Sequence, residues 1–257
     1  MTTTVLITGA TSGIGAEFAR QFAARGCDLV LVARSEESLG RTAADLRRTA
    51  GVEVEVLTAD LLDDAARNRV LERIRAGGDG SGVPAVDVLV NNAGYGLPTS
   101  FADTSLEDEI DHLRIHVEVP LALAHGALQV MRRNGEGTVI NVASVAGFVP
   151  RGSYGAAKAA MISFSRWANV AYGRDGVRVT ALCPGFVHTD FHQRMGVDKG
   201  GVPRLLWLDA GFVVREALRD TAAGRAVSVP GLRYRALVAA ARVLPPSLVT
   251  RAASLGR

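Results

Sequence analysis

Short apolar runs alternate with longer helical patterns through the first 190 residues, and this alternation constrains the fold more than any other feature of the chain. The apolar runs have the length and β-branched composition of strands; they are Val5–Thr8, Asp28–Ala33, Glu53–Leu57, Val86–Asn91, Thr138–Val142 and Val177–Leu182. The intervening segments have helical periodicity; they are Ile14–Arg25, Glu36–Ala50, Asp63–Ala76, Leu106–Arg133 and Tyr154–Gly173. Strands that are apolar on both faces are typical of a parallel sheet covered by helices on either side. We therefore expect an α/β fold with a doubly wound parallel sheet.

After Asp190 the pattern loosens, because residues 191–208 combine glycines, a proline and mixed polarity. Three further elements are expected: a helix at Asp209–Ala223, a seventh strand at Ala226–Val229 and an apolar helical stretch at Leu232–Leu248. No linker or change of composition divides the chain. We expect a single domain over residues 1–257, with a substrate lid at 191–232 and a C-terminal extension at 233–257.

The composition is that of a globular protein, with 48% apolar and 21% charged residues among 257. It excludes disorder as the main state and supplies one sizeable core. No apolar stretch has the ~18–20 residues of a membrane helix, and the first residues lack a signal-peptide pattern. Cys27 and Cys183 both lie in strand-like runs, which favours buried thiols over a disulfide. The expected location is therefore cytoplasmic.

The charge pattern argues against a nucleic-acid partner. The formal net charge is +3, and the basic residues are scattered rather than gathered in one stripe. No metal site is expected. Only two of the 29 Lys and Arg residues are lysines, Lys158 and Lys199. A lysine in such a composition is a candidate for chemistry that arginine cannot supply.

The first strand runs directly into the glycine-rich turn GATSGIG at residues 9–15, which opens a helix. Glycines permit positive φ and let a phosphate approach the backbone closely. The helix N-terminus adds free N–H groups and the positive end of the helix dipole. Such a turn can also be a tight connection without a ligand. Its place at the first strand–helix junction favours a dinucleotide-binding site.

Tyr154 and Lys158 lie four residues apart in a helical pattern and therefore share one face. A phenol has a reference pKa of ~10. An ammonium ~4 Å away, at an effective dielectric constant of ~20, lowers that pKa by roughly three units. This shift would make Tyr154 a general acid or base. The alternative is a core aromatic residue beside a solvated lysine.

Together these motifs resemble the short-chain dehydrogenase/reductase family. The features that carry the resemblance follow one another along residues 8–190: TGATSGIG at 8–15, NNAG at 91–94, Ser144, YGAAK at 154–158 and PGFVHT at 184–189. The resemblance implies a Rossmann-type fold of about seven strands and a nicotinamide cofactor. It also implies an oxidoreductase that acts on CH–OH or C=O groups, with Tyr154 and Lys158 in catalytic roles.

Two further catalytic assignments follow from the resemblance. Ser144 corresponds to the serine that holds a carbonyl oxygen while Tyr154 protonates it. It lies ten residues before Tyr154, a shorter spacing than is common in the family, so Ser153 is an alternative. His116 stands where the family has an asparagine that supports a water relay to the lysine. Because histidine can donate and accept, His116 is either a relay residue or a buried structural histidine.

The cofactor site implied by the resemblance is formed by residues that follow several strands along one edge of the sheet. They are Gly9, Thr11, Ser12, Gly13, Ile14, Gly15, Arg34, Asp60, Asn91, Ala93, Gly94, Tyr154, Lys158, Pro184, Gly185, Val187 and Thr189. Asp60 would contact the adenine or cap the next helix, and Asn91 would lie beside the cofactor or tie neighbouring strands. Arg34 suits a 2′-phosphate, and no acid precedes it to bind a free 2′-hydroxyl. We therefore expect NADP(H) rather than NAD(H).

The expected function is hydride transfer between NADP(H) and a hydrophobic ketone, acyl or sterol-like substrate. Apolar candidates for the walls of the substrate pocket are Tyr95, Leu97, Phe191, Leu205, Leu206 and Trp207. The alternative is a non-catalytic nucleotide-sensing or scaffold protein on the same fold. The C-terminal stretch is basic and apolar, a character that would suit contact with a membrane surface. We expect it instead to pack in a homodimer or homotetramer.

Overall fold

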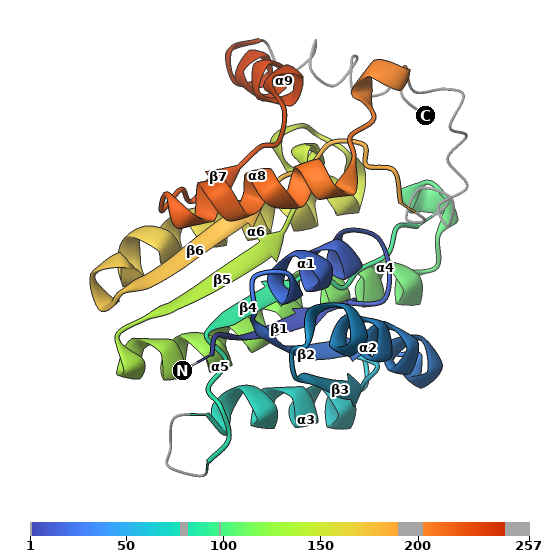
Figure 1. Ribbon diagram of the computed structural model, residues 1–257. Helices are drawn as coiled ribbons and strands as arrows, with labels where there is room; N and C mark the ends of the chain where they lie inside the picture. Colours follow the sequence, from blue (N-terminus) through green and yellow to red (C-terminus); the bar gives the residue numbers. More distant parts are fainter. Residues whose placement is uncertain (1, 78–81, 98, 190–202, 245–257) are drawn as a thin grey trace.

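The computed structural model describes residues 2–77, 82–97, 99–189 and 203–244 (Figure 1). The strands are β1 (Thr4–Thr8), β2 (Asp28–Ala33), β3 (Val54–Thr58), β4 (Val88–Asn91), β5 (Gly137–Val142), β6 (Val177–Leu182) and β7 (Val227–Ser228). The α-helices are α1 (Gly13–Ala23), α2 (Glu36–Ala50), α3 (Asp64–Arg75), α4 (Leu106–Leu113), α5 (Val119–Asn134), α6 (Gly152–Tyr172), α8 (Ala210–Ala222) and α9 (Leu232–Val243).

The strands form one seven-stranded sheet in the order β3-β2-β1-β4-β5-β6-β7, and every neighbouring pair is parallel. This confirms the expected doubly wound, Rossmann-type sheet. The strand order reverses between β1 and β4, so the connections leave in opposite directions there and open a crevice at the carboxyl ends of the strands. That crevice is the place where such folds bind ligands.

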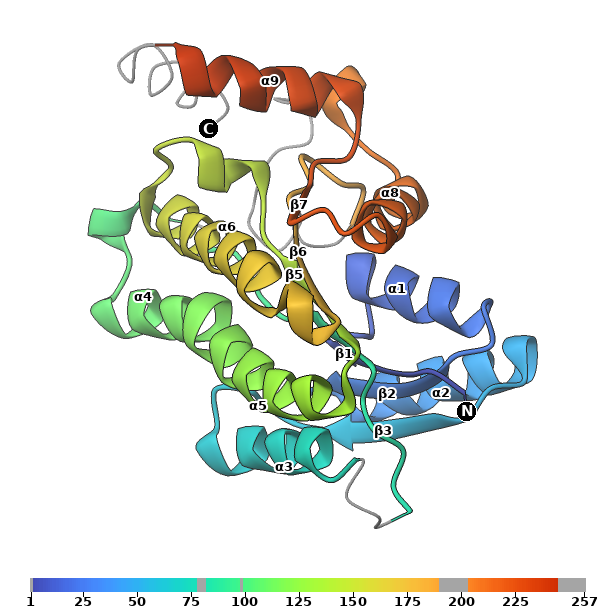
Figure 2. The same cartoon turned by 90° about the vertical axis from the view of Figure 1, so that its left-hand side faces the viewer.

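Helices cover the sheet on both faces (Figure 2). On one face α1, α2 and α8 pack against the strands through buried side chains such as Phe18, Leu39 and Val213. On the other face α3, α5 and α6 do so through side chains that include Val70, Leu123 and Ala168. Because both faces of the central strands are buried, their sequences are apolar throughout.

The helix expected over Leu106–Arg133 is continuous but changes its hydrogen-bond pattern in the middle. Helix α4 ends at Leu113, a π-helical segment spans Arg114–Glu118, and α5 begins at Val119. The cause lies in the sequence, because Pro120 has no N–H to donate to the carbonyl of the residue four positions before it. A π-helical segment of this kind commonly marks a functional site.

The other expected helices and strands are present, and some of their boundaries differ from those expected. Strand β4 starts at Val88 rather than Val86, and α9 ends at Val243. Residues 190–202 and 245–257 lie outside the described residues. They include part of the expected lid and part of the expected C-terminal extension. Both cysteines are free thiols, with Cys183 buried and Cys27 half-buried.

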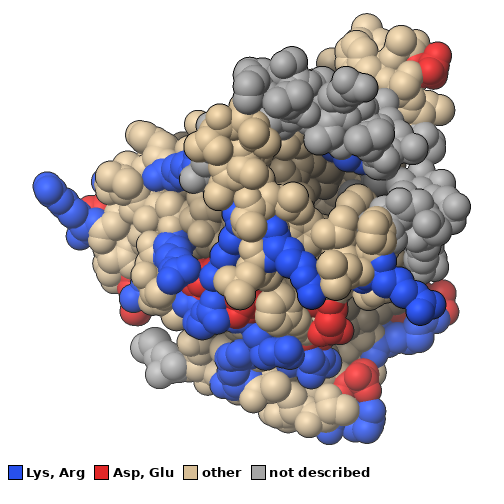
Figure 3. Space-filling view, turned by 90° about the horizontal axis from the view of Figure 1, so that it is seen from above, with Lys and Arg blue, Asp and Glu red and all other residues tan. Residues whose placement is uncertain are grey.

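The surface agrees with the scattered charge of the sequence. On the face seen in Figure 3, Lys and Arg side chains are intermixed with Asp and Glu side chains and with uncharged surface. Within the described ranges, none of the helices combines the length and apolar character that crossing a bilayer requires.

Two helical glycines test how the first turn is packed. An added Cβ at Gly15 would overlap the carbonyl oxygen of Gly9 and the side-chain nitrogen of Asn92, whereas a Cβ at Gly40 meets nothing within 4 Å. We predict that Gly40→Ala stabilises the protein by about 0.5–1 kcal/mol, and that Gly15→Ala destabilises it by about 1–3 kcal/mol. Urea-unfolding midpoints measure both changes. Equal midpoints for the two variants would contradict this packing.

Candidate functional site

A cavity of about 710 Å³ opens at the carboxyl ends of the strands, where the crevice is expected. Its walls bring together segments that are far apart in the chain: the glycine-rich turn, the end of β2, the loop after β4, the segment after β5, the first turns of α6, the loop after β6 and helix α9. The site is therefore long enough for an extended ligand that crosses the sheet edge.

The glycine-rich turn forms one end of the cavity. Gly9 and Gly13 have positive φ angles of 64° and 55°, a conformation that only glycine adopts without strain. Ser12 is the N-cap of α1 and makes no capping bond with its side chain. Thr11, Ser12, Gly13 and Ile14 line the cavity, so the N-terminal N–H groups of α1 are presented to it. This cradle fits the pyrophosphate of a dinucleotide.

Gly15 was expected to contact the cofactor, but its position in the turn is different. It is buried and does not line the cavity. Its missing side chain instead allows α1 to approach the carbonyl of Gly9 and the carboxamide of Asn92. Gly15 therefore shapes the turn rather than contacting a ligand.

Asn91 also lies away from the large cavity. Its amide donates to the carbonyl of Pro120 (3.1 Å) and to Oδ1 of Asn141 (2.9 Å), so it ties β4 to α5 and β5. This is the strand-tying alternative, and it holds because Asn91 points into the interior. The neighbouring Asn92 does line the cavity, and its amide donates to the carbonyls of Thr8 and Gly9.

The second end of the cavity lies beside the ends of β2 and β3. Arg34 and Asp60 line it, and both are exposed. Asp60 accepts from the N–H of Leu62 (3.0 Å), while α3 is capped by Asp63, which accepts from Ala66 (2.7 Å). The helix-cap alternative for Asp60 is therefore wrong. Ser35 and Ser38, which sequence reasoning did not select, line the same end next to Arg34.

Ser144, Tyr154 and Lys158 meet in the middle of the cavity. Ser144 accepts from the N–H of Ala146 (3.1 Å), which fixes its hydroxyl at the end of β5. The Lys158 ammonium donates to the carbonyl of Val142 (2.8 Å) and lies 5.6 Å from the centre of the Tyr154 ring. The structure thus brings together the three residues expected from the sequence.

The pKa of Tyr154 differs in direction from the one expected from the sequence. Burial raises the pKa of Tyr154 to about 12, although a hydrogen bond with Ser144 and the charge of Arg151 act in the opposite direction. Burial also lowers the pKa of Lys158 to about 8. Burial therefore dominates, because the phenol is removed from water, and the expected lowering by the lysine is not among the effects on this pKa. In the free protein Tyr154 is a neutral phenol at pH 7.

The π-helical segment Arg114–Glu118 places His116 beside this group. Its Nε2 lies 2.7 Å from the carbonyl of Tyr95, a hydrogen-bond acceptor only, so Nε2 carries the proton. The ring is buried, and Nδ1 has no partner among the described residues. Burial, and then the charge of Lys158, lower its pKa well below the usual value. His116 is therefore neutral and offers a lone pair on Nδ1.

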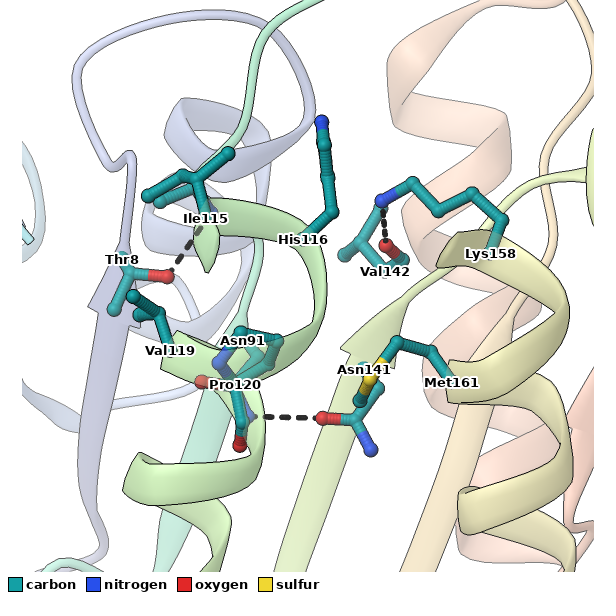
Figure 4. A pocket seen from close by; sticks show the side chains of 11 residues that line it. Thr8, Asn91, Ile115, His116, Val119, Pro120, Asn141, Val142, Lys158 and Met161 are labelled. Atoms are coloured by element: carbon teal, nitrogen blue, oxygen red, sulfur yellow. Dashed lines mark hydrogen bonds between the residues drawn. The ribbon is translucent and has the colours of Figure 1, made fainter. Parts of the chain in front are cut away.

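A small cavity of about 10 Å³ lies between His116 and Lys158. In Figure 4 His116 lies on one side and the Lys158 ammonium on the other, with Asn91 and Asn141 below. The buried Oδ1 of Asn91 has no hydrogen-bond partner among the described residues. This volume is about that of one water molecule, and the polar groups of His116, Lys158 and Asn91 among the apolar lining suit one.

Sequence reasoning missed His112, whose ring lies 4.5 Å from that of His116 and 5.8 Å from that of Tyr154. It is buried, and burial lowers its pKa. The signal was present, because residues 112 and 116 are four apart and share a helix face. Two neutral imidazoles thus stand beside the phenol of Tyr154.

Sequence reasoning also missed Tyr234 on α9. Its hydroxyl accepts from the N–H of Phe186 (3.0 Å) and donates to the carbonyl of Leu206 (2.6 Å), and its ring covers Gly185. Tyr234 therefore fixes the loop that holds Pro184, Gly185, Val187 and Thr189 in the cavity wall. No periodicity in the sequence indicates so distant a contact.

The apolar walls come from different residues than expected. Leu205, Leu206 and Trp207 do not line the cavity, and Trp207 instead stacks on His188 at 4.9 Å. Leu97 is absent from the lining, Phe191 lies outside the described residues, and Tyr95 lines the cavity as expected. The walls are formed largely by the segment after β5 and by α9: Val145, Ala146, Phe148, Val149, Leu237, Val238, Ala240, Ala241 and Leu244.

The buried neutral state of His116 predicts acid sensitivity. Its pKa is lowered in the folded protein and is ~6.5 in the unfolded chain, so below about pH 6.5 only the unfolded chain takes up this proton. The free energy of unfolding therefore decreases as the pH is lowered below about 6.5. We predict that Tm drops more between about pH 7 and about pH 5 in the wild type than in His116→Asn. Parallel Tm curves would contradict a buried neutral His116.

The comparisons with known proteins agree with this geometry. Residues 3–200 match the family model for short chain dehydrogenase. The very-long-chain 3-oxoacyl-CoA reductase of Anas platyrhynchos is 34% identical over 191 residues, which cover 72% of this chain but only 59% of that protein.

Two solved structures cover nearly the whole chain. One is a short-chain dehydrogenase from Sphingobium yanoikuyae in complex with NADPH (TM-score 0.84, 34% identity, 93% of this chain and 94% of that chain). The other is a bulky-bulky ketone specific alcohol dehydrogenase from Comamonas testosteroni (TM-score 0.79, 30% identity, 93% and 92%). The chain therefore belongs to the short-chain dehydrogenase/reductase family, whose members are oxidoreductases that act on CH–OH or C=O groups.

Proposed function

We propose that this protein transfers a hydride between NADP(H) and the carbonyl or secondary alcohol of a hydrophobic substrate. The observation that carries the proposal is the meeting of Ser144, Tyr154 and Lys158 at the centre of a cavity that ends in a phosphate cradle. A non-catalytic nucleotide sensor on this fold has no need of that group. The catalytic reading is therefore favoured over the scaffold alternative.

The residues divide the chemistry among them. The bound nicotinamide cofactor supplies or accepts the hydride. Ser144 donates a hydrogen bond to the substrate carbonyl and orients it. Tyr154, a neutral phenol at pH 7, donates its proton to the oxygen as negative charge develops there. Lys158, held by the carbonyl of Val142, supplies a positive charge that stabilises the phenolate left behind.

His116 completes a relay that returns a proton to Tyr154. Its Nδ1 is an acceptor, and the small cavity between it and Lys158 has the volume of one water. A water there would bridge the imidazole and the ammonium, as the asparagine of the family does with its own water. The relay is favoured over the purely structural alternative because a buried Nδ1 without a partner is costly.

The substrate pocket favours an apolar compound. Its walls are formed by aliphatic and aromatic side chains from the segment after β5 and from α9. One relative is named as a reductase of very-long-chain 3-oxoacyl-CoA, and one structural neighbour as specific for bulky-bulky ketones. These names support a hydrophobic ketone or acyl substrate for this chain.

Assembly of identical copies is the second part of the proposal. Helices α4 and α6 expose large apolar side chains: Leu106, Ile110, Trp167 and Val170. Exposed apolar side chains on neighbouring helices suit packing against a second copy. We propose a homodimer or homotetramer in the cytoplasm, with α9 as a second apolar surface.

Tyr154→Phe tests the catalytic assignment. Loss of the proton donor should lower kcat by at least about 100-fold, while NADPH binding, followed by cofactor fluorescence, stays close to that of the wild type. His116→Leu, which removes only the relay acceptor, should lower kcat less. A Tyr154→Phe variant that retains most of its kcat would show that another group donates the proton.

Arg34→Asp tests the choice of cofactor. It removes a cation that suits the 2′-phosphate and introduces an acceptor that suits a free 2′-hydroxyl. The ratio of kcat/KM for NADPH over NADH should fall by about ten- to a hundredfold. Arg41→Asp is the matched control, since Arg41 is exposed on α2 and does not line the cavity. An equal change in both variants would assign the effect to overall charge.

A further inference from the structure

The first turn of α9 is attached to other parts of the fold by three consecutive side chains. Arg233 donates to the carbonyl of Leu205 (2.8 Å), and Arg235 donates to the carbonyl of Val229 (2.9 Å). Tyr234 lies between them and is the buried member of the three, with 4% of its surface exposed. Its contacts reach the loop after β6, at residues 184–189, which neither arginine bonds.

The Tyr234 hydroxyl joins that loop to the segment that precedes α8. It accepts from the N–H of Phe186 (3.0 Å) and donates to the carbonyl of Leu206 (2.6 Å). The two segments also pair directly, because Leu208 donates to the carbonyl of Phe186 (2.8 Å) and accepts from the N–H of His188 (3.0 Å). Burial raises the pKa of Tyr234, so the hydroxyl retains the proton that it donates. The hydroxyl therefore adds two hydrogen bonds to a short backbone pairing.

The Tyr234 ring lies against the same loop. A Cβ at Gly185 would overlap the ring carbons of Tyr234, so only glycine lets the ring and the loop backbone approach this closely. Both residues line the large cavity, together with Val187 and Thr189 from the loop. The loop and the first turn of α9 are thus in contact at the wall of the site.

The rest of α9 forms a wall at the substrate end of the cavity. Its described side chains, at residues 236–241, 243 and 244, are all Ala, Leu or Val, and several of them line the cavity. Side chains of this kind form no hydrogen bonds, so only apolar packing holds this part of the helix against the body. The position of the wall therefore depends on the attachments of the first turn.

We infer that Tyr234 is a positioning residue that holds the loop at 184–189 and the substrate wall on α9 as one unit. A ligand that fixes the loop then also fixes α9, and a ligand that fixes α9 also fixes the loop, because coupling between two sites is reciprocal. The inference rests on the proposed function, since it takes this loop to contact NADP(H).

The test measures how far the effect of NADP⁺ extends through the protein. Hydrogen–deuterium exchange is followed by mass spectrometry with and without saturating NADP⁺, and calorimetry gives the Kd of NADP⁺; neither needs a substrate. The informative amides are those of α9 and of residues 206 and 207. Leu206 and Trp207 do not line the cavity, so slower exchange there reports a transmitted effect rather than contact with NADP⁺.

Two variants separate the hydroxyl of Tyr234 from attachment in general. Tyr234→Phe removes both hydrogen bonds and keeps the ring on Gly185, so the fold is retained. Arg233→Gln is the matched control, because it removes another attachment of the same turn, to Leu205, without contact with the loop. Thermal unfolding of both variants checks that they are folded.

In the wild type, NADP⁺ should slow exchange at these amides by about three- to tenfold. Tyr234→Phe should bring that factor close to one and raise the Kd of NADP⁺ by about three- to tenfold. Arg233→Gln should leave both values as in the wild type. The wild-type measurement tests the coupling without any substitution.

Three outcomes would overturn the inference while the proposed reaction stands. One is NADP⁺ binding to the wild type without slower exchange in α9 and at residues 206 and 207. Another is equal protection in the wild type and Tyr234→Phe, which would make Tyr234 a structural residue only. The third is equal loss in Tyr234→Phe and Arg233→Gln, which would assign the effect to attachment of α9 in general. A wild type that binds no NADP⁺ would count against the proposed function, and the inference would fall with it.

Discussion

The hydrogen bond from the Lys158 ammonium to the carbonyl of Val142 (2.8 Å) is the interaction on which the site depends. An ammonium in the interior is costly unless its donors are satisfied, and here burial already lowers its pKa to about 8. The bond joins the second turn of α6 to the last residue of β5. It therefore fixes the helix face that carries Tyr154 relative to the strand that leads to Ser144.

Near that bond lie buried polar atoms whose hydrogen bonds only a ligand or a water molecule would complete. The buried Nδ1 of His116 and Oδ1 of Asn91 have no partner among the described residues, and both border the small cavity beside Lys158. The π-helical segment Arg114–Glu118 is what turns His116 toward this place. The π-helical segment thus coincides with the candidate site, while the sheet beneath remains regular.

Sequence patterns predicted much of the fold and the centre of the site, because both rest on local signals. Apolar runs set the strands, and the four-residue spacing of Tyr154 and Lys158 placed both on one helix face. Boundaries and distant contacts escaped this reasoning. Pro120 introduces a π-helical segment into a helix that periodicity alone made regular, and Tyr234 reaches the loop after β6 through tertiary packing. The pKa of Tyr154 was misjudged because a sequence does not display burial, which raises it.

The central claim is that a hydride passes directly from NADPH to a substrate carbonyl, with cofactor and carbonyl held in one relative orientation and Tyr154 as proton donor. Reduction of a bulky ketone with NADPH deuterated separately at each of the two C4 positions tests it most directly. The account predicts that mass spectrometry finds deuterium on the carbinol carbon of the alcohol from only one of the two labelled cofactors. Alcohol that carries no deuterium from either cofactor, or equal deuterium from both, would contradict it.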